Sequence, residues 1–164
     1  MVYLRNILVT TDLSEHSLAA MEYAASFGLL YASDIYLLYV AERHHRRGQA
    51  ADGTNPAQAA EDLDKERASL EEFVARHMGK EIRVIPVVRS GQAAAEIARF
   101  AAEEGMDLVV MATHGWTGLK HILMGSVAER TVRLSRVPVL TVKPRMMRET
   151  IIDEQDIAQE LHYR

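Results

Sequence analysis

The residues best suited to chemistry lie in one glycine-containing stretch in the last third of the chain. Gly115, Gly118 and Gly125 allow a backbone to approach a ligand closely and to present its N–H groups. Ser126 and Glu129 have the spacing of a capping box, which predicts that a helix begins at Ser126. The free N–H groups and the positive dipole end of such a helix suit an anion. The stretch therefore indicates a phosphate site, although by spacing alone plain turn residues and a plain cap explain it equally well.

Other polar residues are weaker candidates. Asp12 is the carboxylate at the end of the first apolar run, where it either faces a ligand or stabilises a helix start near Ser14. His114 borders the glycine stretch, and we expect it to be a loop histidine that bonds the backbone. The basic run 44–47 lacks the spacing of metal ligands and is expected to be a solvated loop. No Walker-type GxxxxGK[ST] pattern and no nucleophile–base pair is evident, so we do not expect an efficient enzyme.

The elements that position these residues follow from alternating apolar runs and helical patterns. Short apolar runs at 6–10, 34–41, 82–88, 107–113 and 137–142 are typical of buried strands. Helical periodicity predicts helices from 14 to 31, 57 to 78, 91 to 105 and 126 to 135. Strands joined through helices run parallel, so we expect an α/β fold: one doubly wound, open five-stranded parallel sheet. Ligands of such sheets bind at the carboxyl ends of the strands. Pro86 indicates that the third strand lies at an edge of the sheet or is weakly paired at that position.

The length and composition of the chain indicate how many domains it forms and which classes of protein it excludes. The 164 residues suffice for one domain, which we expect over 1–144. We expect a tail over 145–164 with a short helix that Asp153 caps. A frayed tail and a docked tail are equally consistent with it. A net charge of −4 gives no basic field for nucleic acid or an anionic membrane. No secretory signal and no long apolar span is evident, so we expect a cytoplasmic protein. With no cysteine, thiolate chemistry is excluded.

Two stretches carry a family resemblance. The first is Thr-Thr-Asp12-Leu-Ser14, and the second is MATHGWTGLKHILMGSVAERTVRLSRVPVLTVKP at 111–144. Over residues 4–143 the chain resembles the universal stress protein family, in particular its ATP-binding branch. The signature of that branch is glycine, two residues, glycine, nine residues, glycine, then serine or threonine. Gly115, Gly125 and Ser126 match it, and Ala112 stands at its first glycine position.

The resemblance implies a fold, a ligand and an assembly. The fold would be Rossmann-like, of the adenine nucleotide alpha hydrolase type, with strand order 3-2-1-4-5. The chain would bind an adenine nucleotide, ATP with Mg²⁺ held mainly by phosphate oxygens and water, and form a homodimer through its last strand. Its function would be a nucleotide-dependent stress-response or signalling module with little or no turnover. The site residues that the resemblance implies are Thr10, Thr11, Asp12, Val40, Met111, Ala112, Gly115, Gly125, Ser126, Val127 and Ala128.

Two alternatives stay open at this point, and a third is disfavoured. One is a slow ATPase. Another is a dimerisation or interaction module that has lost nucleotide binding, because Ala112 adds a methyl group where the resemblance places the ribose. A nucleotidyl-transfer enzyme of similar fold is disfavoured, because such relatives often carry an SGG-type loop where this chain has Thr-Thr-Asp12-Leu-Ser14.

Overall fold

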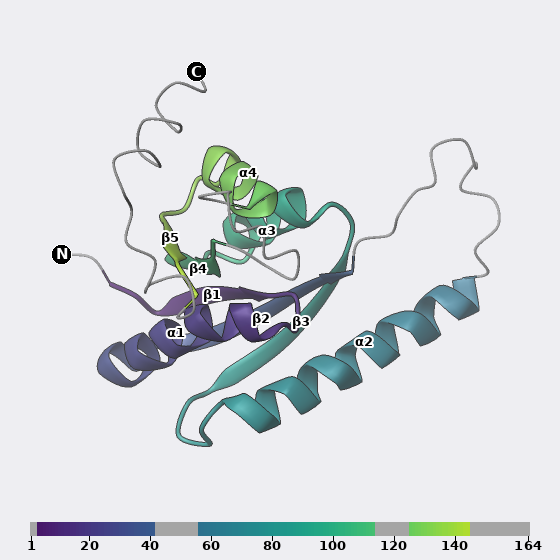
Figure 1. Ribbon diagram of the computed structural model, residues 1–164, viewed down its shortest axis with the longest axis horizontal. Coiled ribbons are helices and arrows are strands. Elements are labelled where there is room, and N and C mark those ends of the chain that lie inside the picture. Colours follow the sequence, from purple (N-terminus) through teal and green to yellow (C-terminus); the bar gives the residue numbers. More distant parts are fainter. Residues whose placement is uncertain (1–2, 42–55, 114–124, 145–164) are drawn as a thin grey trace, which may run out of the picture.

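The computed structural model describes residues 3–41, 56–113 and 125–144, and the side chains of all of these except 56–59. Strands and helices alternate along the chain (Figure 1). The elements are β1 (Asn6–Thr11), a 3₁₀ turn η1 (Glu15–Ser17), α1 (Leu18–Tyr31), β2 (Asp34–Ala41), α2 (Pro56–His77), β3 (Val84–Ser90), α3 (Ala93–Glu103), β4 (Leu108–Ala112), α4 (Ser126–Leu134) and β5 (Val139–Val142). The tail predicted at 145–164 lies outside the described residues.

The five strands form one sheet in the order β3-β2-β1-β4-β5, and every neighbouring pair is parallel. This confirms the predicted fold class and strand order. Pro86 lies in β3, an outermost strand, as its missing N–H group favours. The order reverses direction at β1, because β2 and β4 lie on its two sides. That reversal is where a doubly wound sheet opens a crevice at its carboxyl edge.

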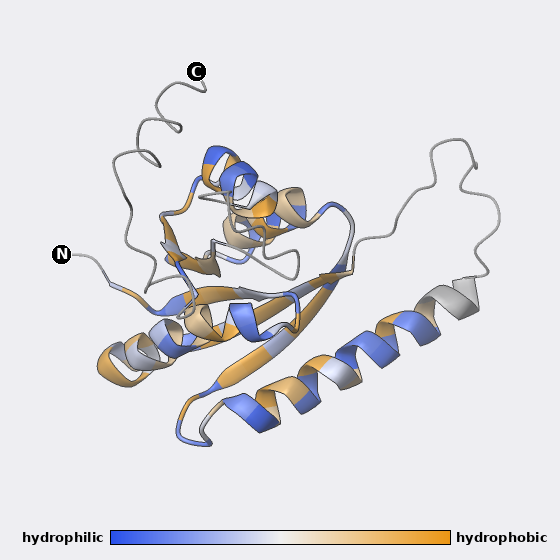
Figure 2. Ribbon diagram, viewed as in Figure 1, coloured by the Kyte–Doolittle hydropathy of each residue, from blue (hydrophilic) through white to orange (hydrophobic). Residues whose placement is uncertain are grey.

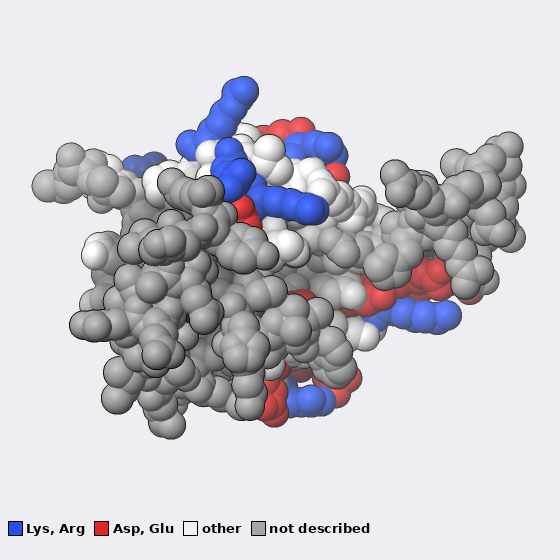
Figure 3. All heavy atoms as spheres, turned by 45° about the horizontal axis from the view of Figure 1, so that its top comes forward, with Lys and Arg blue, Asp and Glu red and all other residues white. Residues whose placement is uncertain are grey.

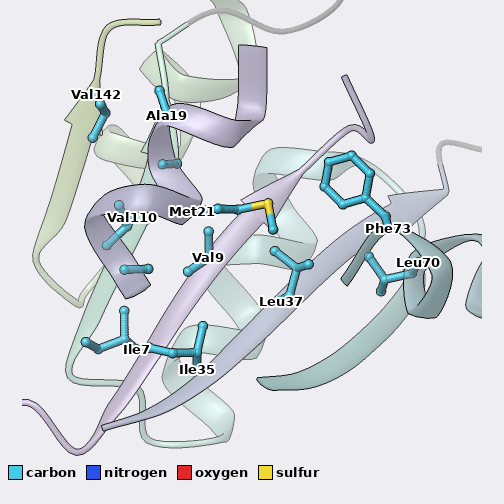
Figure 4. Close-up of a cluster of buried hydrophobic side chains, with 12 residues drawn as sticks. Ile7, Val9, Ala19, Met21, Ile35, Leu37, Leu70, Phe73, Val110 and Val142 are labelled. Atoms are coloured by element: carbon cyan, nitrogen blue, oxygen red, sulfur yellow. The ribbon is translucent and has the colours of Figure 1, made fainter. Parts of the chain in front are cut away.

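Helices cover both faces of the sheet. One core cluster joins the inward side chains of α1 and α2 to the strands, and Figure 4 shows Met21, Phe73 and Leu70 packed over Val9 and Leu37. The hydropathy colouring in Figure 2 shows the same division, since the strands are mainly apolar and α2 carries many hydrophilic residues. Helix α2 is therefore held to the sheet by one apolar stripe along its inner side.

The opposite face carries α3 and α4. Their side chains Ile97, Phe100 and Ala128 pack with Leu8 and Val109 in a second buried cluster. Leu8, Val9 and Val109 are all fully inaccessible to solvent. Consecutive residues of β1 thus point into the two different clusters, which explains why its sequence is a continuous apolar run rather than an alternating one.

A carboxylate joins the start of the central strand β1 to the start of β4 by hydrogen bonds. Asp107, just before β4, accepts hydrogen bonds from the backbone N–H groups of Arg5 and Asn6 through Oδ2, at 2.7 and 2.9 Å. The Asp107 N–H in turn donates to the Asn6 carbonyl at 2.8 Å. These bonds set the register of β1 against β4 at the end of the sheet opposite the carboxyl edge.

Two predicted helix starts differ from the structure. Ser14 precedes the 3₁₀ turn η1, α1 begins only at Leu18, and no side-chain bond caps either. The Ser14 hydroxyl donates its proton to Asp12 Oδ1, and no N–H group of the 3₁₀ turn donates to its oxygen. In α4 the cap position is Gly125, again without a side-chain bond, and Ser126 is the first helical residue. The predicted capping box at Ser126 is therefore wrong, although the helix begins where the sequence indicated.

Candidate functional site

A cavity of about 550 Å³ opens at the carboxyl edge of the sheet, at the reversal of strand order. It lies between the ends of β1, β2 and β4 and the first turns of α3 and α4. The lining residues are Thr10, Thr11, Asp12, Ser17, Leu38, Tyr39, Val40, Ala93, Ile97, Met111, Ala112, Thr113, Gly125, Ser126, Val127 and Ala128. Every predicted site residue within the described ranges is among them. Gly115 lies outside the described residues.

The turn after β1 is shaped by hydroxyl groups. The Thr11 Oγ1 accepts the backbone N–H of Leu13 at 2.9 Å and lies 2.8 Å from the Ser17 Oγ. Because the Ser17 hydroxyl donates to the Ser14 carbonyl at 2.7 Å, Thr11 must be the donor to Ser17. These bonds hold Leu13 in the left-handed region, at a φ of 62°, where a bulky residue is rare. The turn built in this way carries Asp12 at the cavity wall.

Asp12 is exposed, and its carboxylate is oriented by its own turn. Its Oδ1 accepts the backbone N–H of Ser14 at 3.1 Å and the Ser14 hydroxyl at 2.5 Å. Ser14 is buried and is not part of the cavity lining. A carboxylate can accept several hydrogen bonds on its two oxygens, so Asp12 at the cavity wall can also accept hydrogen bonds from a ligand.

The amino end of α4 forms another part of the wall. The Gly125 N–H donates to the Thr113 carbonyl at 2.6 Å, which joins the two ends of the segment 114–124 at the cavity. The first turn, Ser126 to Ala128, then lines the cavity with N–H groups that an α-helix leaves without intrahelical partners. With the positive dipole end, this wall is suited to an anion such as a phosphate group.

The position of Ala112 at the end of β4 requires no glycine. Among the described residues, only Leu13 and Ala32 combine a side chain with a positive φ, so the backbone of Ala112 is an ordinary one. Its methyl group, half-buried, and the Met111 side chain form the floor beside Val40 of β2. The departure from the glycine pattern therefore narrows the cavity without straining the strand.

Sequence reasoning missed Tyr39. This residue of β2 lines the cavity, and its side chain packs against the core cluster that includes residues of α1 and α2. Burial raises the pKa of Tyr39, and the negative charges of Glu66 and Asp12 raise it further, so the phenol keeps its proton. Leu38, Ser17, Thr113 and the α3 residues Ala93 and Ile97 were also not predicted as lining residues. Leu38, Ala93 and Ile97 reach the cavity because α3 packs on β2, whereas Ser17 and Thr113 come from the segments that follow β1 and β4.

Charge is distributed in local pairs on the described surface. Figure 3 shows basic and acidic side chains side by side on its visible face. Arg133 pairs with Glu129 at 2.7 Å and Arg99 with Glu96 at 2.6 Å. Within residues 3–41, 56–113 and 125–144, no group of three or more His, Asp or Glu side chains could hold a metal ion. In the same ranges, no helix is long and apolar enough to cross a bilayer.

Residues 4–143 match the model of the universal stress protein family. The chain belongs to this family. Universal stress protein MJ0531 of Methanocaldococcus jannaschii is 33% identical over 141 residues, which cover 85% of this chain and 82% of the relative. Universal stress protein MJ0577 of the same organism is 29% identical over 156 residues, covering 87% of this chain and 96% of the relative.

Solved structures of universal stress proteins share the fold. The structure of MJ0577 superposes with a TM-score of 0.68 at 28% identity, over 88% of this chain and 99% of that one. A universal stress protein in complex with cAMP gives a TM-score of 0.62 at 21% identity, covering 86% and 98% of the two chains. The universal stress protein of Archaeoglobus fulgidus in complex with dAMP gives 0.60 at 18%, covering 87% and 100%.

Proposed function

We propose that this universal stress protein binds ATP in the cavity at the carboxyl edge of its sheet and acts as a nucleotide-dependent stress-response module. The observation that carries the proposal is the meeting, in one cavity, of the amino end of α4 with the β1 turn that bears Asp12. Relatives of the same fold that hold cAMP and dAMP support an adenine nucleotide as the ligand class.

The two walls suggest how the nucleotide lies. Ser126, Val127 and Ala128 offer backbone N–H groups to the phosphates, and Gly125, whose own N–H is bonded to the Thr113 carbonyl, lines the cavity beside them. The adenosine would lie toward Asp12, between the ends of β1, β2 and β4. Thr10, Thr11, Val40, Met111 and Ala112 line that part of the cavity. Mg²⁺ would arrive with the nucleotide, since phosphate oxygens and water are its preferred ligands and Asp12 is the carboxylate among the described lining residues.

We expect little or no turnover of the bound nucleotide. The hydroxyl group that lies on the Asp12 carboxylate belongs to Ser14, which is buried outside the cavity lining. It is therefore not placed to attack a phosphate. A slow ATPase remains the competing proposal, and release of inorganic phosphate during incubation with ATP and Mg²⁺ would support it.

The deciding experiment is denaturation of the purified protein, chromatography of any released nucleotide, and calorimetric titration of the stripped protein with ATP and Mg²⁺. We expect bound adenine nucleotide or rebinding in the micromolar range, lost in Gly125→Val. The backbone of Gly125 is extended, at φ −65° and ψ 152°, so it is compatible with valine, which adds side-chain volume at a residue of the cavity lining. Gly105→Asn is the control, because a side chain there meets open space and asparagine accepts its φ of 64°.

Absence of any nucleotide, together with no binding at millimolar ATP, would refute the proposal. The chain would then be an interaction module that has lost its ligand. Ala112, which adds a methyl group at the glycine position of the family pattern, would be the first residue to substitute. Ala112→Gly restores the glycine of the family pattern and leaves the strand backbone unstrained.

We also propose a homodimer through β5. This strand is outermost, pairs only with β4 among the described strands, and has four residues. The neighbouring helix α4 leaves Val132 and Leu134 about half exposed, at 47% and 54%. An open strand edge beside exposed apolar side chains favours pairing with a second copy. Sedimentation equilibrium tests the assembly: we expect a dimer, weakened by Val132→Glu, and a monomer at all concentrations would contradict it.

A further inference from the structure

A buried serine lies behind the exposed carboxylate of the cavity wall. Ser14 is 6% exposed and does not line the cavity, whereas Asp12 is exposed and does line it. The Ser14 hydroxyl donates to Asp12 Oδ1 at 2.5 Å, and the Ser14 N–H donates to the same oxygen at 3.1 Å. Burying a hydroxyl costs free energy unless it is hydrogen-bonded, and this hydroxyl bonds a solvent-exposed group. The bond therefore orders a side chain at the cavity rather than one in the core.

Ser14 is itself held by the turn that leads into α1. Its carbonyl accepts the Ser17 N–H at 3.1 Å and the Ser17 hydroxyl at 2.7 Å. The Thr11 Oγ1, which lies 2.8 Å from the Ser17 Oγ, accepts the Leu13 N–H at 2.9 Å. Leu13 packs against the core cluster, although its φ is 62°. Ser14 thus links a turn that is fixed by buried contacts to the carboxylate of Asp12.

A ligand gains when it finds this carboxylate already oriented. A free aspartate side chain samples several rotamers, and a ligand that bonds it must immobilise it at a cost in free energy. In this chain two donors of Ser14 fix one oxygen of Asp12 in the structure without a ligand. The cavity has a second ordered wall at α4, where Ser126 to Ala128 offer backbone N–H groups. A ligand that uses both walls therefore depends on the orientation of Asp12.

We propose that Ser14 is a positioning residue for nucleotide binding, which holds the Asp12 carboxylate in the orientation that accepts hydrogen bonds from the nucleoside end of the ligand. The inference rests on the proposed nucleotide binding and extends the site to a buried residue outside the cavity lining. Ser14 does not touch the nucleotide, so its effect on affinity passes through Asp12. The nucleoside groups concerned are hydroxyl and amino donors, because a carboxylate only accepts hydrogen bonds.

Calorimetric titration with ATP and Mg²⁺ tests this role. Ser14→Ala removes the hydroxyl and keeps the N–H and carbonyl groups of the same residue. We expect the affinity for ATP to fall about three- to tenfold, the range that corresponds to the cost of ordering one side chain on binding. Ser14→Thr keeps a hydroxyl on an extended backbone, at φ −87° and ψ 160°, which suits a β-branched residue. It should restore the affinity to within about twofold of the unsubstituted protein.

Ser33→Ala is the matched control. Ser33 is similarly buried, at 4% exposed, and its hydroxyl also donates at 2.5 Å, to the Leu4 carbonyl. It precedes β2 at the amino edge of the sheet, away from the cavity. Ser33→Ala should therefore lower the free energy of unfolding, as Ser14→Ala does, and leave the affinity for ATP unchanged. In an Asp12→Ala protein, whose α4 wall still meets the phosphates, we expect Ser14→Ala to change the affinity by less than about twofold.

The outcomes are distinct. Unchanged affinity in Ser14→Ala, or equal weakening in Ser14→Ala and Ser33→Ala, would overturn the positioning role. An equal loss with and without Asp12 would also overturn it, because Ser14 would then act by another route. Ser14→Cys keeps the packing volume but has only a weak donor, so it should weaken binding in the same direction and replaces Ser14→Ala if circular dichroism shows that variant unfolded. Failure of the unsubstituted protein to bind ATP at millimolar concentration refutes the proposed function itself.

Discussion

Replacing Thr11 with valine tests whether hydroxyl groups hold the turn that carries Asp12. Valine keeps the shape of threonine and its preference for a strand, and removes only the hydroxyl. Two hydrogen bonds are lost: the one donated to the Ser17 Oγ and the one accepted from the Leu13 N–H. At about 1 kcal/mol each, we expect Thr11→Val to lower the free energy of unfolding by about 2 kcal/mol. The Leu13 N–H is left without its acceptor while Leu13 stays at a φ of 62°.

Urea unfolding followed by circular dichroism measures the loss. Thr10→Val is the matched control: Thr10 precedes Thr11 in the same strand and lines the cavity, and no side-chain hydrogen bond joins it to the described residues. We expect a change below about 0.5 kcal/mol there, the ordinary range for a site without such contacts. Thr11→Ser, which keeps the hydroxyl, should recover most of the loss. Equal effects of Thr10→Val and Thr11→Val would refute the argument.

Three further predictions concern the buried Thr131 hydroxyl, the Asp107 carboxylate that holds β1 to β4, and the Tyr39 phenol. Thr131→Val should raise the free energy of unfolding by about 1 kcal/mol in urea titrations, because the fully buried Thr131 hydroxyl has no partner among the described residues; a loss of stability would show a missed bond. Asp107→Ala should lower it by about 2 kcal/mol, since two backbone N–H groups lose a charged acceptor, and an unchanged thermal midpoint would contradict this. The folded pKa of Tyr39 is raised, so its contribution to stability is complete below about pH 10 and is lost as the pH rises through the folded pKa. Tyr39→Phe should remove that part of the alkaline decline, and an identical decline in both proteins would count against it.

The layout of the fold was predictable because its physics is local. Strands buried on both faces must be continuous apolar runs, and β2 and β4 are the plainest examples. The edge position of β3 was predictable from Pro86 for the same kind of reason. Its limits were not: the predicted strand began at 82, but the Ile82 N–H donates to the Gly79 carbonyl in a turn, so β3 begins at Val84.

The residues of the site were also predictable only where they belong to a local sequence pattern. The glycine motif and the ends of the strands were visible in the sequence, and the described residues of that set do line one cavity. Side chains that compete for local partners were not predictable, and Ser14 bonds Asp12 rather than capping a helix. Glu66 acts on the pKa of Tyr39, 27 positions away in the sequence, only because α2 packs along β3, the neighbour of β2 in the sheet. The signal for that pair was a glutamate within the inward stripe of α2, which the periodicity of Leu70 and Phe73 makes visible.

The two outer strands of the sheet differ in a way that bears on how many copies can join. β3 contains Pro86, which has no N–H group to offer to an added strand, whereas β5 contains no proline. Two chains that meet along β5 would leave only their β3 edges facing outward. Because Pro86 weakens the pairing of a further strand at each of those edges, assembly through strand pairing stops at two subunits. The difference between the two edges therefore permits a dimer and disfavours a fibre.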